Sequence, residues 1–198
     1  MVRLSTLLYQ TLAVVSVLGQ TAPNADAQYV LNQTAVYLSS ARDLALEAQN
    51  IDTLSCLLYA ADRGAYAKIV PILNQIKDFF REFGPTIEGR PPLDKTISSD
   101  VTVAKSILNN IARATIQVSN AVDEMIEGGG SLNLCSVAPG LGKGISTALR
   151  GVRISIPIFY IPVFTFAAPE LAEIQRYYFS VLKDLDSGIE AFEGLIKV

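Results

Sequence analysis

Apolar positions along most of the chain recur every three or four residues, which is the spacing of one face of an α-helix. The longest such run lies between residues 100 and 127, where the apolar positions follow a 3,4,3,4 spacing. Asp100 is placed to cap this helix, and the glycines at 128–130 end it. Its stripe consists of Val101, Ala104, Leu108, Ile111, Thr115, Val118, Val122 and Met125. The stripe predicts a helix that packs one face against other helices.

The same spacing predicts four further helices. They cover residues 27–49, 53–62 and 65–83, and a C-terminal segment that begins at Pro169. Asp52 is placed to cap the second of these helices, Gly64 to end it, and Pro71 to kink the third. Because few segments alternate like a strand, the sequence predicts an all-α fold. We expect an antiparallel helical bundle in a single domain, residues 28–198.

One segment departs from this pattern. ISIPIFYIPVFTFAAP, residues 154–169, carries no charge, four aromatic rings and three prolines. It is too short for an ordinary membrane-spanning helix, which needs about 20 apolar residues. Proline removes a backbone donor and biases the residue before it towards extended conformations, here Ile156 and Ile161. The sequence therefore predicts a short helix at 145–152, followed by an extended aromatic, proline-rich connection before the last helix.

Three roles for residues 154–169 remain open. The segment crosses the bundle core as a buried loop, lines a cavity for an acyl chain or sterol, or contacts the surface of a bilayer. The first two roles are compatible, since a loop that lines a cavity is also part of the core.

Charge is distributed unevenly along the chain. The 42 residues 128–169 contain no acidic side chain and carry +3, whereas the whole chain carries −3. A basic, apolar, acid-free stretch attracts anionic lipid headgroups or fatty carboxylates. The net negative charge argues against nucleic acid as a partner.

The N-terminus has the layout of a secretory signal peptide. Arg3 precedes an apolar run at residues 12–18, and small residues follow. We expect a signal peptide within residues 1–27, with cleavage after Gly19 or Ala27. The sequence therefore predicts a secreted, extracellular protein.

Secretion places the two cysteines in an oxidising compartment. Cys56 and Cys135 lie 79 residues apart and are predicted to form a disulfide, which contributes about 4 kcal/mol on the chain-entropy model. Asn32 begins a glycosylation sequon, so we expect a glycoprotein.

The side chains of most hydrolases are missing. The chain contains no histidine, which excludes Ser-His-Asp and Cys-His catalysis and histidine-ligated metal sites. Residues 138–144, APGLGKG, fail the phosphate-loop pattern at two positions. The acidic side chains near residues 123–127 and 184–190 are spaced as solvated helix faces. We therefore expect no enzyme activity, no metal and no cofactor.

Two stretches carry a family resemblance. SSDVTVAKSILNNIARATIQVSNAVDEMI, from residue 98, and DLDSGIEAFEGLI, from residue 184, resemble the fungal hydrophobic surface-binding and cell-wall galactomannoprotein family. The similarity covers about residues 28–127 and 170–198. It implies a secreted helical bundle that is associated with the cell wall, and in some members one that holds fatty acids between its helices or coats hydrophobic surfaces. The cysteine pair and residues 154–169 depart from the family pattern, so no binding residue is carried over.

These observations lead to one functional hypothesis. The chain is expected to be a secreted, non-enzymatic protein that binds a fatty acid, sterol or similar lipid among its helices. The predicted wall consists of Ile156, Ile158, Phe159, Tyr160, Val163, Phe164 and Phe166. Arg150 or Arg153 is expected to meet a carboxylate headgroup.

Two alternatives belong to other classes. An interaction or effector-like protein would have a filled core and would use exposed loops such as residues 84–99. A membrane-active protein would use residues 131–168 against a membrane or another hydrophobic surface.

Overall fold

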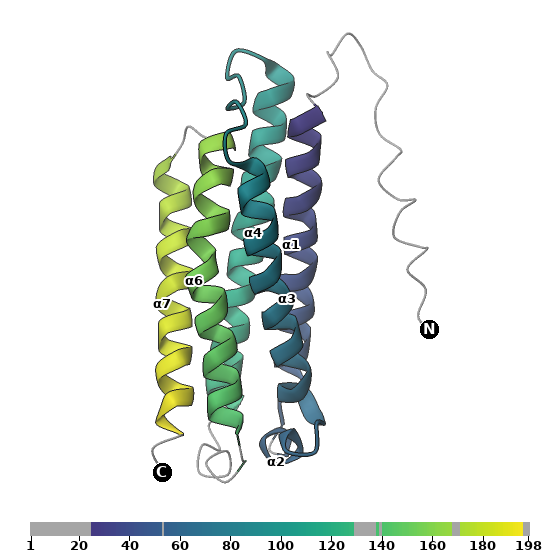
Figure 1. Ribbon diagram of the computed structural model, residues 1–198, viewed down its shortest axis with the longest axis vertical. Coiled ribbons are helices and arrows are strands. Elements are labelled where there is room, and N and C mark those ends of the chain that lie inside the picture. The colour runs from purple at the N-terminus through teal and green to yellow at the C-terminus, as the bar shows by residue number, and fades with distance from the viewer. Residues whose placement is uncertain (1–24, 53, 129–137, 139, 168–170, 196–198) are drawn as a thin grey trace, which may run out of the picture.

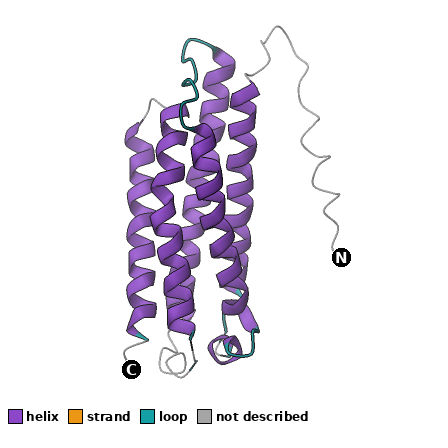
Figure 2. Ribbon diagram, viewed as in Figure 1, coloured by secondary structure: helices purple, strands orange, loops and turns teal. Residues whose placement is uncertain are grey.

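The computed structural model describes most of the chain as a long helical bundle (Figure 1). It describes residues 25–52, 54–128, 138, 140–167 and 171–195. Within these residues the helices are α1 (Ala25–Gln49), α2 (Ser55–Tyr59), α3 (Gly64–Ile87), α4 (Ser98–Gly128), α6 (Leu141–Ala167) and α7 (Leu171–Gly194). Figure 2 shows no strand in the described part of the chain. The predicted all-α bundle is confirmed.

The long helices form a closed ring. Successive long helices run in opposite directions along the bundle axis, as expected from the sequence (Figure 1). Around the ring, α1 contacts α3 and α4, α6 contacts α3 and α7, and α7 contacts α4. The two most extensive interfaces, α1 with α4 and α3 with α6, join helices that run in the same direction. The bundle is therefore antiparallel along the chain, but its largest interfaces are parallel.

The α4 stripe was predicted better in its second half than in its first. Ile111, Thr115, Val118, Val122 and Met125 are all buried, as expected. Nearer the N-terminus the buried residues are Val103 and Ile107, whereas the predicted Val101, Ala104 and Leu108 are only half-buried. A helix of 31 residues drifts by about 20° per heptad against a strict 3,4 repeat, so one pattern cannot face the core along its whole length.

Local signals at helix ends are partly confirmed. Asp52 Oδ1 accepts hydrogen bonds from the Leu54 amide at 3.1 Å and the Ser55 hydroxyl at 2.7 Å, and Ser55 Oγ accepts from the Asp52 amide at 3.0 Å. This reciprocal arrangement begins α2 as predicted. Gly64, expected to end that helix, is instead the first residue of α3, where its φ of 77° favours glycine. Asp100 lies inside the first turn of α4, where its carboxylate accepts a hydrogen bond from the Asp94 amide.

The predicted extended connection is wrong. Residues 154–167 continue α6, with Pro157 and Pro162 inside the helix. A proline in a helix interior costs about 3 kcal/mol, whereas burying one large apolar side chain contributes about 1.5–3 kcal/mol. Six large apolar side chains of the segment are buried: Ile156, Phe159, Tyr160, Val163, Phe164 and Phe166. Their combined burial outweighs the two prolines, because only a helix turns these side chains to one side.

One of these prolines is matched by a glycine on the neighbouring helix. Pro162 has no amide hydrogen, so the carbonyl of Ile158 loses its partner within α6. On α3, a Cβ atom added to Gly84 would lie 2.1 Å from that carbonyl oxygen. The α3 backbone therefore lies against the oxygen that Pro162 leaves free, and only glycine permits the approach.

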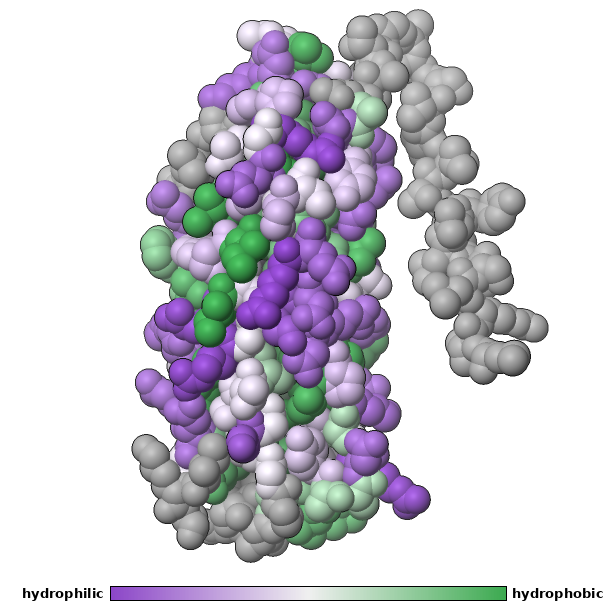
Figure 3. Space-filling model, viewed as in Figure 1, coloured by the Kyte–Doolittle hydropathy of each residue, from purple (hydrophilic) through white to green (hydrophobic). Residues whose placement is uncertain are grey.

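By length and composition, α6 is long and apolar enough to cross a membrane. Half of its most apolar window is nevertheless buried inside the bundle. Its outward residues include Ile154, Ile158 and Ile161, of which Ile161 is 59% exposed. The face drawn in Figure 3 shows hydrophobic residues scattered among hydrophilic ones. The burial of α6 is therefore that of a core helix whose outward edge is apolar.

Candidate functional site

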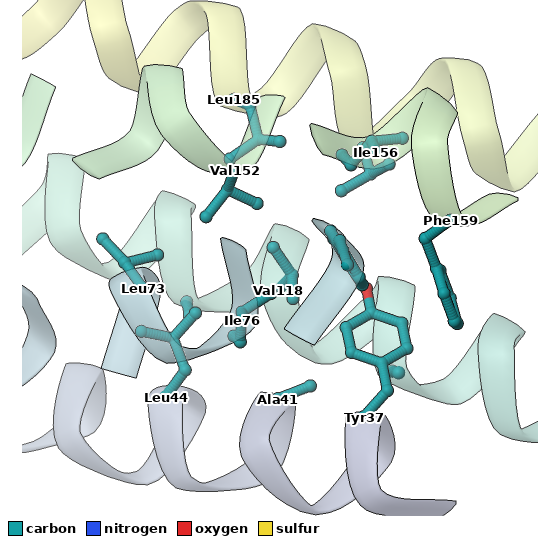
Figure 4. Close-up of a cluster of buried hydrophobic side chains, with 14 of the residues drawn as sticks. Tyr37, Ala41, Leu44, Leu73, Ile76, Val118, Val152, Ile156, Phe159 and Leu185 are labelled. Atoms are coloured by element: carbon teal, nitrogen blue, oxygen red, sulfur yellow. The ribbon is translucent and has the colours of Figure 1, made fainter. Parts of the chain in front are cut away.

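Aromatic rings from α1, α3, α6 and α7 gather in one part of the bundle. We call this group the aromatic core; it consists of Tyr37, Phe79, Phe80, Phe83, Phe159, Tyr160, Phe164 and Tyr178. Phe80 and Phe159 stack with centroids 4.8 Å apart, and Tyr37 meets Phe80 edge-on at 4.9 Å. Figure 4 shows Tyr37 reaching inwards from α1 on the side where Phe159 lies on α6. The helices that carry these rings are brought together only by the tertiary fold.

Three hydroxyls meet inside this apolar environment. Tyr37 Oη lies 3.2 Å from Tyr160 Oη, and Tyr160 Oη lies 2.6 Å from Thr115 Oγ1. Thr115 Oγ1 also donates to the carbonyl of Ile111 at 2.8 Å. The three side chains, which we call the hydroxyl triad, come from α1, α4 and α6 and are at most 1% exposed. The triad is thus a small polar centre within an apolar core.

The triad is held uncharged. Burial raises the pKa of Tyr160 to about 12, although its hydrogen bonds with Thr115 and Tyr37 act in the opposite direction. The pKa of Tyr37 is also raised, first by burial and then by the neighbouring Tyr160. Both phenols therefore stay protonated near neutral pH, and the site offers hydroxyl groups rather than a base or an anion.

The residues predicted to form a wall lie on α6 in two groups. Ile156, Phe159, Tyr160, Val163, Phe164 and Phe166 are buried within the bundle. Ile158 is 38% exposed and lies on the outer edge. Burial therefore brings the first group together inside the bundle.

The two arginines predicted to meet a headgroup pair with α7. Arg153 donates to both carboxylate oxygens of Asp186, from Nε at 2.5 Å and from Nη2 at 3.0 Å. Arg150 forms an ion pair with Glu193. The side chains of Arg150 and Arg153 are 54% and 42% exposed. Both guanidinium groups therefore lie at the surface along the α6–α7 seam.

Sequence reasoning missed the partners on α1 and α3. Tyr37, Phe80 and Phe159 pack together, yet only Phe159 was expected at the site. One signal was present: Thr115 is a polar residue inside an otherwise apolar stripe. A hydroxyl at such a position needs a buried partner, and the structure supplies Tyr160.

The interface between α1 and α3, which we call the α1–α3 seam, lies beside the aromatic core. Phe79 is partly buried there and contacts Tyr37, Phe83 and Phe159. At one end of the seam Arg90 pairs with Asp26 and lies over the Tyr29 ring, 4.9 Å from its centroid. At the other end Lys68 pairs with Glu47 at 3.2 Å. Between these two ion pairs, Phe79 separates the surface from the rings inside.

A polar groove of about 260 Å³ lies elsewhere, between α1 and α4. It is lined by Ala45, Gln49, Gln117, Asn120, Ala121, Asp123, Glu124 and Glu127. Desolvation, followed by the nearby Asp184 and Glu127, raises the pKa of Asp123. Among the described residues no group of three or more His, Cys, Asp or Glu side chains is arranged to hold a metal ion. The groove's polar lining does not suit an acyl chain.

Other predicted sites are placed only in part. Cys56 is buried at the end of the bundle, but Cys135 lies outside the described residues, so the disulfide stays a prediction. Residues 1–24 and Pro169 also lie outside the described residues. Asn32 is exposed on α1.

Comparison with known proteins gives likenesses in structure. No protein-family model matches the chain, and no curated protein matches it. Two solved structures of ligand binding domain 2 of the Penicillium marneffei MP1 protein, each in complex with arachidonic acids, are 15% identical to this chain. They superpose with TM-scores of 0.64 and 0.61, covering 89% and 88% of this chain and 99% of theirs.

A third solved structure, Afmp4p in complex with palmitic acid, is 13% identical, with a TM-score of 0.58 over 86% of this chain and 99% of its own. At this level of identity the three likenesses establish a shared fold. They confirm, for the fold, the distant resemblance to the fungal cell-wall galactomannoprotein family that the sequence indicated.

Proposed function

We propose that this protein binds a hydrophobic small molecule with one polar end, of the fatty acid or sterol class, among helices α1, α3, α4 and α6, and that it is not an enzyme. The observation that carries the proposal is the hydroxyl triad inside the aromatic core. Rings and aliphatic side chains suit the tail of such a molecule, and neutral hydroxyls suit its polar end. The shared fold with domains solved in complex with arachidonic and palmitic acids supports it.

The wall of the proposed site comes mainly from α6. Ile156, Phe159, Tyr160, Val163, Phe164 and Phe166 supply it, joined by Tyr37 and Phe80 from α1 and α3. Ile158 is left out because it lies at the surface, and the hydroxyl triad replaces Arg150 and Arg153 as the partner of the polar end. Each buried methylene of a tail contributes about 0.8 kcal/mol, so a long tail can offset the cost of separating packed rings.

The proposed entrance is the α1–α3 seam. Phe79 lies between the surface and Phe159, and within the described residues the ion pairs across the seam lie at its two ends. A rotation of Phe79 would therefore expose the aromatic core without breaking a backbone hydrogen bond.

The proposal includes secretion, with a disulfide between Cys56 and Cys135, a glycan on Asn32 and a location outside the cell or in its wall. Cleavage after Gly19 would keep α1 whole. Cleavage after Ala27 would remove Asp26 and with it the ion pair to Arg90. We therefore favour Gly19.

A single tryptophan offers a direct test, because the chain has none. Phe159→Trp places the reporter in the aromatic core, and Ile161→Trp places a matched reporter on the exposed edge of the same helix. Palmitic acid at pH 5 should change the emission of the first variant and leave the second unchanged. Native mass spectrometry of the secreted protein should show a lipid-sized adduct that organic extraction removes.

The two alternative functions predict other results. A clean ligand-free mass, with Phe159→Trp emission indifferent to fatty acids, would overturn the proposal and favour an interaction protein with a filled core. A blue shift of Ile161→Trp on addition of anionic liposomes, together with dye leakage, would favour membrane activity through the outer edge of α6.

A further inference from the structure

The inference concerns the charge state of the ligand and rests on the proposed function. We infer that the site binds the polar end of its ligand in uncharged form, as an alcohol or a protonated fatty acid, and discriminates against a carboxylate. Three observations carry it: the groups that face the triad, the placement of the cations, and the direction of the triad's hydrogen bonds.

The groups that face the triad are neutral on every element that contributes to it. They are Tyr37 from α1, Phe79 and Phe80 from α3, Thr115 from α4, Tyr160 from α6 and Tyr178 from α7. The tyrosines are the titratable members of this set. Among the described residues, the groups that perturb Tyr37 and Tyr160 are each other and Thr115, with no charged side chain among them. A carboxylate placed here would lose its hydration without gaining a cation.

The cations of the same helices are held elsewhere. Arg150 and Arg153 pair with acidic residues of α7 at the surface. Arg153 also interacts electrostatically with Tyr178, but its guanidinium is held by Asp186. Arg81 of α3 donates from Nε to the Ser155 hydroxyl at 3.0 Å. Arg42 of α1, Arg113 of α4, and Arg176 and Lys183 of α7 are exposed. Lys77 of α3, which is 22% exposed, pairs with Asp78. An anion at the triad would therefore lack the compensating charge that buried carboxylates require.

The direction of the hydrogen bonds points the same way. Thr115 uses its proton on the carbonyl of Ile111, so at 2.6 Å Tyr160 is the donor to Thr115. Tyr37 then donates to Tyr160, and the lone pairs of Tyr37 Oη are the open end of the chain. That end accepts a hydrogen bond from an O–H group, which an alcohol or a protonated acid supplies and a carboxylate does not. To bind a carboxylate, Tyr37 would have to donate to it. Both hydrogen bonds of the triad would then reverse, and Thr115 would lose its hydrogen bond to the Ile111 carbonyl.

The test compares three twelve-carbon ligands on the unmodified protein: dodecanol, dodecanoic acid and methyl dodecanoate. Affinity is measured by displacement of an uncharged fluorescent probe at pH 5, 7 and 9. The dissociation constant of the acid should rise about tenfold for each pH unit above the carboxyl pKa, while that of the alcohol stays constant. Equal affinity for the acid at pH 5 and pH 9 would overturn the inference and leave the proposed function standing. Failure of all three ligands at every pH would overturn both.

A variant tests the hydrogen-bond direction separately. Tyr37→Phe removes the open acceptor, so binding of dodecanol should weaken about tenfold, whereas the methyl ester, which has no donor, should bind as before. Tyr178→Phe removes a hydroxyl outside the triad from a ring that contacts Tyr160, and serves as the matched control. An equal loss for alcohol and ester would overturn the assigned direction, since it would report packing rather than hydrogen bonding.

Discussion

The two largest interfaces of the bundle, α1 with α4 and α3 with α6, differ in the size of the side chains that they bury and in their proline content. Buried alanines recur on α1 and α4: Ala27, Ala41, Ala45 and Ala48 on the first, and Ala114 and Ala121 on the second. Neither helix contains a proline. The α3–α6 interface instead carries stacked rings, and its two helices contain Pro71, Pro85, Pro157 and Pro162.

The contrast separates a rigid half from an adaptable one. Away from the polar groove that Ala45 and Ala121 line, small side chains let α1 and α4 pack closely. With no proline, these helices keep their backbone hydrogen-bond ladders. On α3 and α6 each internal proline removes one such bond and leaves a carbonyl free. We expect the α3–α6 half to rearrange around a ligand while the α1–α4 half stays fixed.

The largest change in stability is expected at the close contact between Gly84 of α3 and the Ile158 carbonyl of α6. Gly84→Val forces α3 away from the Ile158 carbonyl and should lower the free energy of unfolding by about 3 kcal/mol or more. Gly194→Ala, at a helical glycine whose added Cβ meets nothing within 4 Å, is the matched control and should be neutral. Urea unfolding measures both. Equal stability of the two variants would show that α3 and α6 do not approach as described.

The triad joins the two halves, and high pH should loosen it. The pKa of Tyr160 is raised from 10.0 to about 12, so the unfolded state loses its phenolic proton first. Protonated Tyr160 therefore contributes fully to the free energy of unfolding below pH 10. Between about pH 10 and pH 12 this contribution falls by about 1.4 kcal/mol per pH unit. In Tyr160→Phe the free energy of unfolding, measured with urea between pH 9 and 11.5, should fall less steeply with pH, because this contribution is absent. An unchanged slope would mean that Tyr160 is not buried.

The rigid half should resist added volume. Ala114→Leu inserts three carbon atoms at a fully buried position of α4 and should cost about 2 kcal/mol. Ile116→Leu, on the exposed side of the same helix, should cost almost nothing. Thermal unfolding compares the two variants. If Ala114→Leu were tolerated equally well, α1 and α4 would be no tighter than the rest of the bundle.

The smallest effect tests the adaptable half directly. Pro157→Ala returns an amide donor to the Arg153 carbonyl and should stabilise the protein by about 1 kcal/mol, less than the intrinsic proline penalty because the helix already accommodates the ring. If α6 moves when ligand leaves, stopped-flow release of a fluorescent fatty acid should slow in this variant. Faster release would contradict an adaptable α6.

The sequence predicted what depends on neighbours along the chain. The Asp52 cap needs only Ser55, three residues away, and it is present. The proline rule is also local, and it failed in α6 because the burial of Phe159 and its companions is a property of the whole bundle. Local evidence sets a cost, but tertiary packing decides the outcome.

Of the candidate site, the sequence predicted only the residues that α6 contributes. Phe159 and Tyr160 were expected from the composition of their segment, whereas Tyr37 lies 123 residues from Tyr160. Helical periodicity says which face of a helix is buried but not which helix lies opposite. For the same reason the acidic partners of Arg150 and Arg153 on α7 could not be foreseen.

Because α6 is long and apolar enough to cross a membrane, the order in which the helices are synthesised matters. A ribosome makes the chain from its N-terminus, so α1, α3 and α4 leave the exit tunnel before α6 does. This helix, the most apolar of the described ones, therefore emerges when its main partner, α3, is already available to cover it. In a circular permutant that began at Leu141 this order would be reversed. Its first product would be an uncovered apolar helix, open to chaperones, aggregation and the membrane-insertion machinery.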